Sequence, residues 1–119
     1  LSRVIPVARG IAPFCPKRNT PLSEGVFAGV DVVSRRLDRL KRGLKGRVEV
    51  RSTSARWAWV EAVLARGGVA EGRAVLEAVH AGGSFAAYEK AFRALGAGGG
   101  KASKRALPVL PREGELPVA

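Results

Sequence analysis

Four side chains in the sequence are of types that could carry out catalysis: Cys15 as a nucleophile, and Glu61, Glu77 and His80 as acids or bases. Nucleophilic catalysis needs a nucleophile and a base within hydrogen-bonding distance of each other. No pair of these residues has the spacing of a known nucleophile–base arrangement. His80 falls at an expected helix end, where the dipole favours a surface imidazole, and Glu61 is expected to be solvated or paired with arginine. These residues do not indicate an independent enzyme.

Cys15 is the one cysteine of the 119-residue chain. It has no partner for an intramolecular disulfide, and no Cys/His spacing suits zinc or an iron–sulfur cluster. No apolar run approaches the roughly 20 residues needed to cross a bilayer, and the first residues lack the order of a signal peptide. The sequence therefore predicts a cytoplasmic protein with no membrane partner.

The elements that would position these side chains follow from the spacing of apolar residues. An extended strand is expected within residues 3–14 and a half-buried one at 47–52, where charged and apolar residues alternate. Pro6 removes one backbone donor, so the first strand should have a free or bulged side there. Helices are expected at 27–44, 55–66, 70–80 and from a Ser84 cap to Leu95. This order predicts an α/β fold in which a βα crossover joins parallel strands.

Apolar residues three and four positions apart identify the helix faces expected to point inward. Those residues are Val30, Val33, Leu37, Leu40 and Leu44 in the first helix, Trp57, Val60, Val63 and Leu64 in the second, Val75, Leu76 and Val79 in the third, and Phe85, Tyr88, Phe92 and Leu95 in the fourth. Residues 96–119 have no such periodicity and are predicted to be a flexible, basic tail rich in glycine and proline. The chain thus divides into a folded region, 1–95, and the tail.

A formal charge of +11, from 21 basic and 10 acidic residues, favours acidic partners. The first helix concentrates this charge on its outer face, which also contains Lys41. The candidate phosphate-contacting residues there are Arg35, Arg36, Arg39 and Arg42. The sequence leaves two interpretations of this face open, a solvated surface and a nucleic-acid-binding surface. Trp57, Trp59, Tyr88 and Phe92 could stack on bases, but their helical spacing favours core packing.

The segment between the first strand and the first helix carries a family resemblance. Phe14-Cys-Pro-Lys-Arg-Asn-Thr-Pro21 resembles the Phe-x-Pro-Lys-x-x-Thr-Pro segment late in the catalytic barrel of radical S-adenosylmethionine (radical SAM) proteins, particularly those with a cobalamin-binding domain. The segments Ser54–Gly67 and Gly82-Gly-Ser-Phe85 are similar to later parts of that family. Cys15 and the pair Arg18-Asn19 depart from its pattern. The resemblance spans residues 4–95.

The resemblance implies that the chain is the C-terminal part of a radical SAM enzyme, a partial β/α barrel of about two strands and four helices with a helical extension. Barrel active sites lie at the carboxyl ends of the strands, so Lys17, Asn19 and Thr20 are the candidates for polar contacts with substrate or cofactor. A proline-braced turn with Lys17 in solvent is the alternative. The family uses an iron–sulfur cluster, S-adenosylmethionine and, in this subgroup, cobalamin. One thiolate cannot hold a four-iron cluster, so no cofactor is expected on this segment alone and catalysis would need the upstream part of the parent enzyme.

Two other functions remain as alternatives. A small basic protein that binds RNA or DNA would use the basic helix and should bind in a salt-dependent way. An assembly protein would use its unpaired strand edge and the aromatic helix to contact a second copy of itself.

Overall fold

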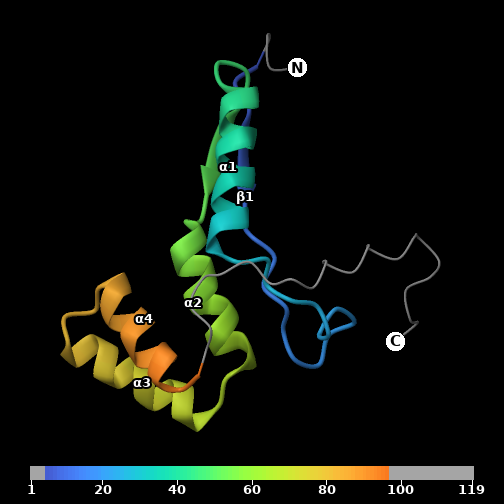
Figure 1. The fold of residues 1–119 in the computed structure, drawn as a ribbon. Coiled ribbons are helices and arrows are strands. Elements are labelled where there is room, and N and C mark those ends of the chain that lie inside the picture. The colour runs from blue at the N-terminus through green and yellow to red at the C-terminus, as the bar shows by residue number, and fades with distance from the viewer. Residues whose placement is uncertain (1–4, 97–119) are drawn as a thin grey trace.

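The computed structural model describes residues 5–96, and the tail predicted at 96–119 lies, except for Gly96, outside them. The elements in chain order are β1 (Ala8–Ile11), α1 (Val30–Leu44), β2 (Glu49–Ser52), α2 (Ala55–Arg66), α3 (Val69–His80) and α4 (Phe85–Ala94). Figure 1 shows α1 beside the two strands and α2 leading away from the sheet to α3 and α4. The α/β class and the element order predicted from the sequence are confirmed. No helix among residues 5–96 is long and apolar enough to cross a membrane.

The strands β1 and β2 form a parallel pair joined by α1, as the βα crossover predicts. Ala8 lies opposite Glu49 and Ile11 opposite Ser52. The Glu49 N–H donates to the Val7 carbonyl at 2.9 Å, and the Thr53 N–H to that of Ile11 at 3.4 Å. Backbone groups alternate sides along a strand, so Ala8 and Gly10 direct theirs to the other edge. That edge is unpaired among the described residues.

The two faces of this sheet differ. Ile11 packs against α1, with Val33 and Leu37 in the same cluster. Alternation places Ala8 and Gly10, together with their register partners Glu49 and Arg51, on the opposite face. All four of these residues are exposed, and the Arg51 Nε donates to the Glu49 carboxylate at 2.8 Å. The sheet is therefore covered on one face and open on the other.

Helices α2, α3 and α4 enclose an aromatic core. Phe92 is fully buried, and only 4% of the surface of Trp59 is exposed. Their rings meet edge to face with centroids 5.7 Å apart, a favoured aromatic geometry. The predicted serine caps are confirmed, because Ser54 accepts a hydrogen bond from the Trp57 N–H and Ser84 one from the Ala87 N–H, both at 3.2 Å. Burial of Trp59 and Phe92 leaves neither ring open to stack on a base.

The sequence-based orientation of α3 is wrong for two of its three inward residues, whereas Val75 packs against the core. Leu76 and Val79, expected inside, are 57% and 53% exposed, whereas Ala74 and Ala78 are buried. Small alanine side chains let α3 approach α4 and the Phe92 ring closely, and the aromatic residues of α2 and α4 supply the bulk of the core. Periodicity located an apolar stripe, but the core uses the neighbouring alanine stripe.

Smaller corrections concern the ends and exposed residues of the other elements. Helix α1 begins at Val30, three residues later than predicted, because the backbone at Gly29 has a φ of 97°. Strand β1 begins two residues after Pro6, so the proline is outside the ladder. Other residues expected inside but found exposed are Leu40, Trp57, Leu64 and Leu95. Trp57 still meets the Phe85 and Tyr88 rings of α4 edge to face.

Candidate functional site

The loop between β1 and α1 is held against α2. The Cys15 thiol donates to the Ala58 carbonyl at 3.3 Å, and the neighbouring Pro16 is fully buried. Burial raises the pKa of the Cys15 thiol, and the nearby Glu61 carboxylate raises it further. A thiol with a raised pKa is a poor nucleophile because little of it is thiolate. Cys15 therefore serves the packing of the loop.

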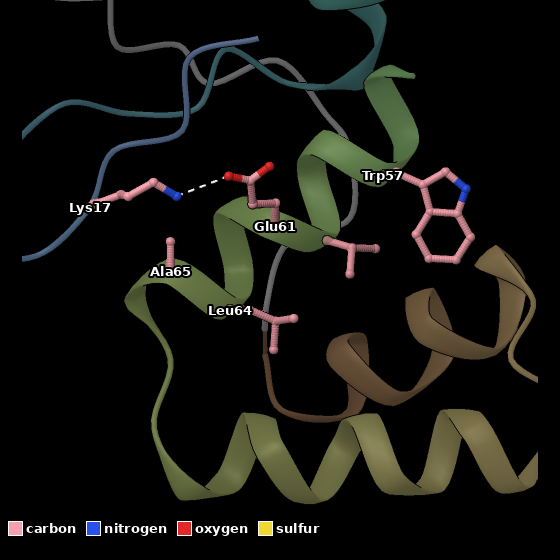
Figure 2. Close-up of a pocket in the computed structure, with 6 residues that line it drawn as sticks. Lys17, Trp57, Glu61, Leu64 and Ala65 are labelled. Atoms are coloured by element: carbon pink, nitrogen blue, oxygen red, sulfur yellow. Dashed lines mark hydrogen bonds and ion pairs between the residues drawn. The ribbon is translucent and has the colours of Figure 1, made fainter. Parts of the chain in front are cut away.

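Lys17 and Glu61 join the loop to the middle of α2. Their Nζ and Oε1 atoms are 2.9 Å apart, and both side chains are about half exposed. The hydrogen bond and charge of Glu61 raise the pKa of Lys17, which stays protonated. Figure 2 shows the two side chains meeting across the gap between the loop and α2. Lys17 is thus neither a free lysine in solvent nor a neutral amine able to act as a base.

The Lys17–Glu61 pair borders a shallow groove of about 440 Å³. Its other lining residues belong to one face of α2 and are Trp57, Val60, Leu64 and Ala65. The Trp57 ring lies at the far end from Lys17 (Figure 2) and meets the Tyr88 ring edge to face at 5.4 Å. The groove has an apolar floor with one cation and one anion, which already neutralise each other. It contains no nucleophile–base pair.

The other two loop candidates shape the turn. The Thr20 hydroxyl donates to the Lys17 carbonyl at 2.7 Å, and the Thr20 carbonyl accepts from the Ser23 N–H at 3.0 Å. Asn19 has a φ of 59°, in the left-handed region that asparagine tolerates better than most residues. Asn19 and Thr20 are exposed. These contacts agree with the alternative interpretation, a proline-braced turn, except that Lys17 is paired with Glu61 instead of being free in solvent.

Sequence reasoning missed the contacts that close the loop onto the end of α2. The Arg66 Nη1 donates to the Gly25 carbonyl at 3.1 Å. The Arg18 Nη2 donates in turn to the Arg66 carbonyl. These partners are more than forty positions apart, and arginine–carbonyl bonds have no spacing rule. The sequence therefore provided no signal for these contacts.

The remaining catalytic candidates do not converge. His80 and Glu77 are exposed on α3, and Cys15 is on the other side of α2 in the β1–α1 loop. Within residues 5–96, no group of three or more His, Cys, Asp or Glu side chains could hold a metal ion.

The basic side chains of α1 are at the surface, and Arg36 also lines an apolar groove together with Leu37 and Leu40. Arg35, Arg36, Arg39 and Arg42 are all exposed. None of the four forms an ion pair with a carboxylate of the described residues. The Arg42 Nε donates to the Asp38 carbonyl at 3.4 Å, a contact within the helix. The helix consequently presents a row of cations that is available to an anionic partner.

A second groove, of about 190 Å³, separates α1 from the end of β1. Its lining residues are Ile11, Pro13, Phe14, Ala28, Val33, Arg36, Leu37 and Leu40. Phe14 and Leu40 are 44% and 43% exposed. The groove is apolar except for the Arg36 guanidinium, and no described element fills it.

Comparisons with known proteins add no relative, since no family model, curated protein or solved structure matches this chain.

Proposed function

We propose that this chain is the C-terminal part of a β/α-barrel enzyme of the radical SAM type, and that it contributes a late pair of barrel strands and a helical cap. It does not catalyse the reaction alone. The observation that supports this most strongly is the open parallel sheet. Parallel sheets in proteins are normally covered on both faces, whereas within residues 5–96 this one has two unpaired edges and an exposed face.

The charge on the open face supports a barrel over a sheet covered by helices on both sides. A covering helix would need apolar residues beneath it, but the open face has Glu49 and Arg51 opposite Ala8 and Gly10. In a barrel the face opposite the helices points to the interior, where side chains from all the strands pack together. Glu49 and Arg51 would enter that interior as a hydrogen-bonded ion pair, with Nε and Oε1 2.8 Å apart.

The position of the helical region is also compatible with a barrel enzyme. The β1–α1 loop and α2 both follow the carboxyl ends of their strands, the side on which barrel active sites lie. Helix α2 continues away from the sheet instead of turning back along it (Figure 1). In the proposed parent, α2, α3 and α4 would cap part of the barrel mouth, with the Lys17–Glu61 groove beside it.

The residues present do not fit the family's iron–sulfur cluster. Cluster ligation needs several thiolates, whereas Cys15 is the one cysteine of the chain and its buried thiol is bonded to a backbone carbonyl. Any cluster would therefore be held by another part of the parent enzyme. This chain would form part of the wall of the active site on the substrate side and would exclude water from it.

The coding sequence upstream of Leu1 tests the proposal. We expect an in-frame region that encodes Cys-x-x-x-Cys-x-x-Cys, preceded by a cobalamin-type domain. The joined protein, purified without oxygen and reconstituted with iron and sulfide, should bind a cluster and cleave S-adenosylmethionine, whereas the present chain alone should do neither. An upstream stop codon with a ribosome-binding site directly before Leu1 would contradict the proposal.

A second candidate function, binding to RNA or DNA, is favoured by the unpaired arginines of α1. In a plot of log affinity for duplex DNA against log salt concentration, each phosphate contact adds about 0.9 to the steepness of the downward slope. Replacing Arg35, Arg39 and Arg42 with Gln should reduce that slope by two to three in fluorescence anisotropy. The same change at Arg56, Arg73 and Arg93 is the matched control for net charge. Equal losses in both triple variants would indicate non-specific attraction to a basic protein and would contradict a site on α1.

A further inference from the structure

We infer that the open edge of β1 and the groove beside α1 together form the docking site for the preceding strand of the parent chain, and that this strand brings a carboxylate to Arg36. The inference rests on the proposed function in one respect, the identity of the occupant as upstream sequence. The chemistry of the site is argued from the described residues alone.

The edge of β1 can accept another strand. Ala8 and Gly10 direct their backbone groups to the unpaired edge, and a Cβ built on Gly10 would meet nothing within 4 Å. Unpaired edges bind extended chains through backbone hydrogen bonds. Pro6 and Pro13 flank the edge, and Pro6 cannot donate a hydrogen bond there. The accessible edge is thus short and matches a single barrel strand.

The groove gives this edge an apolar side pocket. Helix α1 packs against β2, which leaves the space beside the end of β1 open. Phe14 and Leu40 border that space and remain over two-fifths exposed. Adding a strand to β1 would bring its alternate side chains towards Phe14 and Leu40. A large aliphatic or aromatic residue of the added strand, or of the helix attached to it, would fill the groove.

Arg36 determines the charge that the occupant must carry. Its side chain lines the groove, and no carboxylate within residues 5–96 pairs with it. A guanidinium beside an apolar pocket is stabilised by a carboxylate that reaches it in bidentate geometry. A second copy of this chain would instead bring another arginine-rich α1 to the same edge. Charge therefore favours an acidic, apolar strand over self-association.

A library of short random peptides displayed on phage can test the site with the full chain as bait. We expect enrichment of extended peptides that combine large apolar residues with Asp or Glu. Arg36→Glu should reverse this preference towards Lys and Arg, with at least about a tenfold loss of affinity for the acidic peptides. Arg39→Glu makes the same charge change three residues further along α1, at a side chain that does not line the groove. This variant should leave the peptide preference unchanged. Circular dichroism establishes that both variants are folded.

Hydrogen exchange locates the bound peptide. The amides of Ala8 and Gly10 should exchange more slowly in the complex, and Leu40→Glu should abolish both the protection and the binding. No enrichment, binding that is equal in the Arg36 and Arg39 variants, or protection confined to α3 would overturn the inference. Concentration-dependent dimerisation that Leu40→Glu abolishes would also overturn it, because the occupant would then be a second copy.

The failure of this inference can be separated from failure of the proposed function. If acidic peptides bind at β1 but the upstream sequence lacks the cysteine motif, the docking site stands and the family assignment falls. If the motif is present but binding does not depend on Arg36, the family assignment stands and the docking site falls.

Discussion

The sheet region, residues 5–54, and the helical region, residues 55–96, bury their apolar side chains to different extents. The helical region closes around Phe92, which has no exposed surface, and Trp59. The sheet region buries Val33 and Leu37 but leaves Phe14 and Leu40 over two-fifths exposed, and both of its strand edges are unpaired among residues 5–96. The helical region also exposes large apolar residues, Leu76 and Val79 among them, and Phe27 and Val30 of the sheet region pack against its core. The clearest difference is therefore the pair of open strand edges, which are surfaces that can bind a neighbouring strand.

This difference shows where the missing interactions of the chain lie. Parallel strands need neighbours at their edges and cover on both faces, and among the described residues one face is covered by α1, with Phe27, Ala28 and Ala55 in the same cluster. Three helices can enclose a core without such neighbours. The contacts between the β1–α1 loop and α2 connect the two regions, so a partner that orders the sheet would also affect the loop.

The largest effect should come from removing the centre of the helical core. Phe92→Ala should destabilise the chain by about 3–5 kcal/mol, because a fully buried ring leaves a cavity. That loss is comparable with the whole stability of a small domain. Denaturant unfolding followed by far-ultraviolet circular dichroism measures it. Phe14→Ala makes the same change in the sheet region, where the ring is 44% exposed, and should cost about 1 kcal/mol. Equal costs would refute the contrast between the regions.

The second effect tests the orientation of α3. Ala78 is 1% exposed and lies in the core beside Phe92. Ala78→Leu should therefore overpack the core and destabilise the chain by about 1–3 kcal/mol. Leu76→Ala, at a site that is 57% exposed, should change stability by less than about 0.5 kcal/mol. If urea unfolding shows a larger loss of stability for Leu76→Ala than for Ala78→Leu, the orientation expected from periodicity would be correct after all.

The third effect concerns the helix caps and sharpens the boundary between the regions. Ser84→Ala removes the acceptor for the Ala87 N–H and should cost about 1 kcal/mol, whereas Ser84→Gly should cost only a few tenths. Hydrogen exchange should rise in α4 and not in β1 or β2. Faster exchange throughout the sheet would mean that the two regions unfold together, which would contradict local unfolding of α4.

Local signals in the sequence were sufficient to predict most of the fold. Serine caps at Ser54 and Ser84, glycine-containing stops and apolar spacing located the four helices found within residues 5–96, and alternation located β2. These signals act within a few residues of their effect. The orientation of α3 was not accessible in this way. Ala78 is buried because Phe92 lies beside it, and that pairing depends on how α3 and α4 turn around Gly82 and Gly83.

The candidate site was predicted less completely, for a similar reason. The proline-rich run indicated an ordered loop, and the backbone bonds of Thr20 agree with that. The partners that hold the loop, Glu61 for Lys17 and Gly25 for Arg66, are forty or more positions away. Charge identity alone cannot select one carboxylate among the ten acidic residues of the chain. Only the packing of α2 against the loop makes that selection.

The smallest effect concerns the Lys17–Glu61 ion pair between the two regions. Both side chains are more than half exposed, so solvent and salt screen the attraction. Glu61→Gln should lower the melting temperature slightly at low salt and not at high salt. Glu61 raises the pKa of Lys17 in the folded chain, so the pair stabilises the fold below the ordinary lysine pKa, and this contribution is lost as the pH rises through the raised value. Glu77→Gln, at an exposed carboxylate with no ion pair in the described chain, is the control. If both variants melt alike at every pH and salt concentration, Cys15, Pro16 and Arg66 hold the loop without this pair.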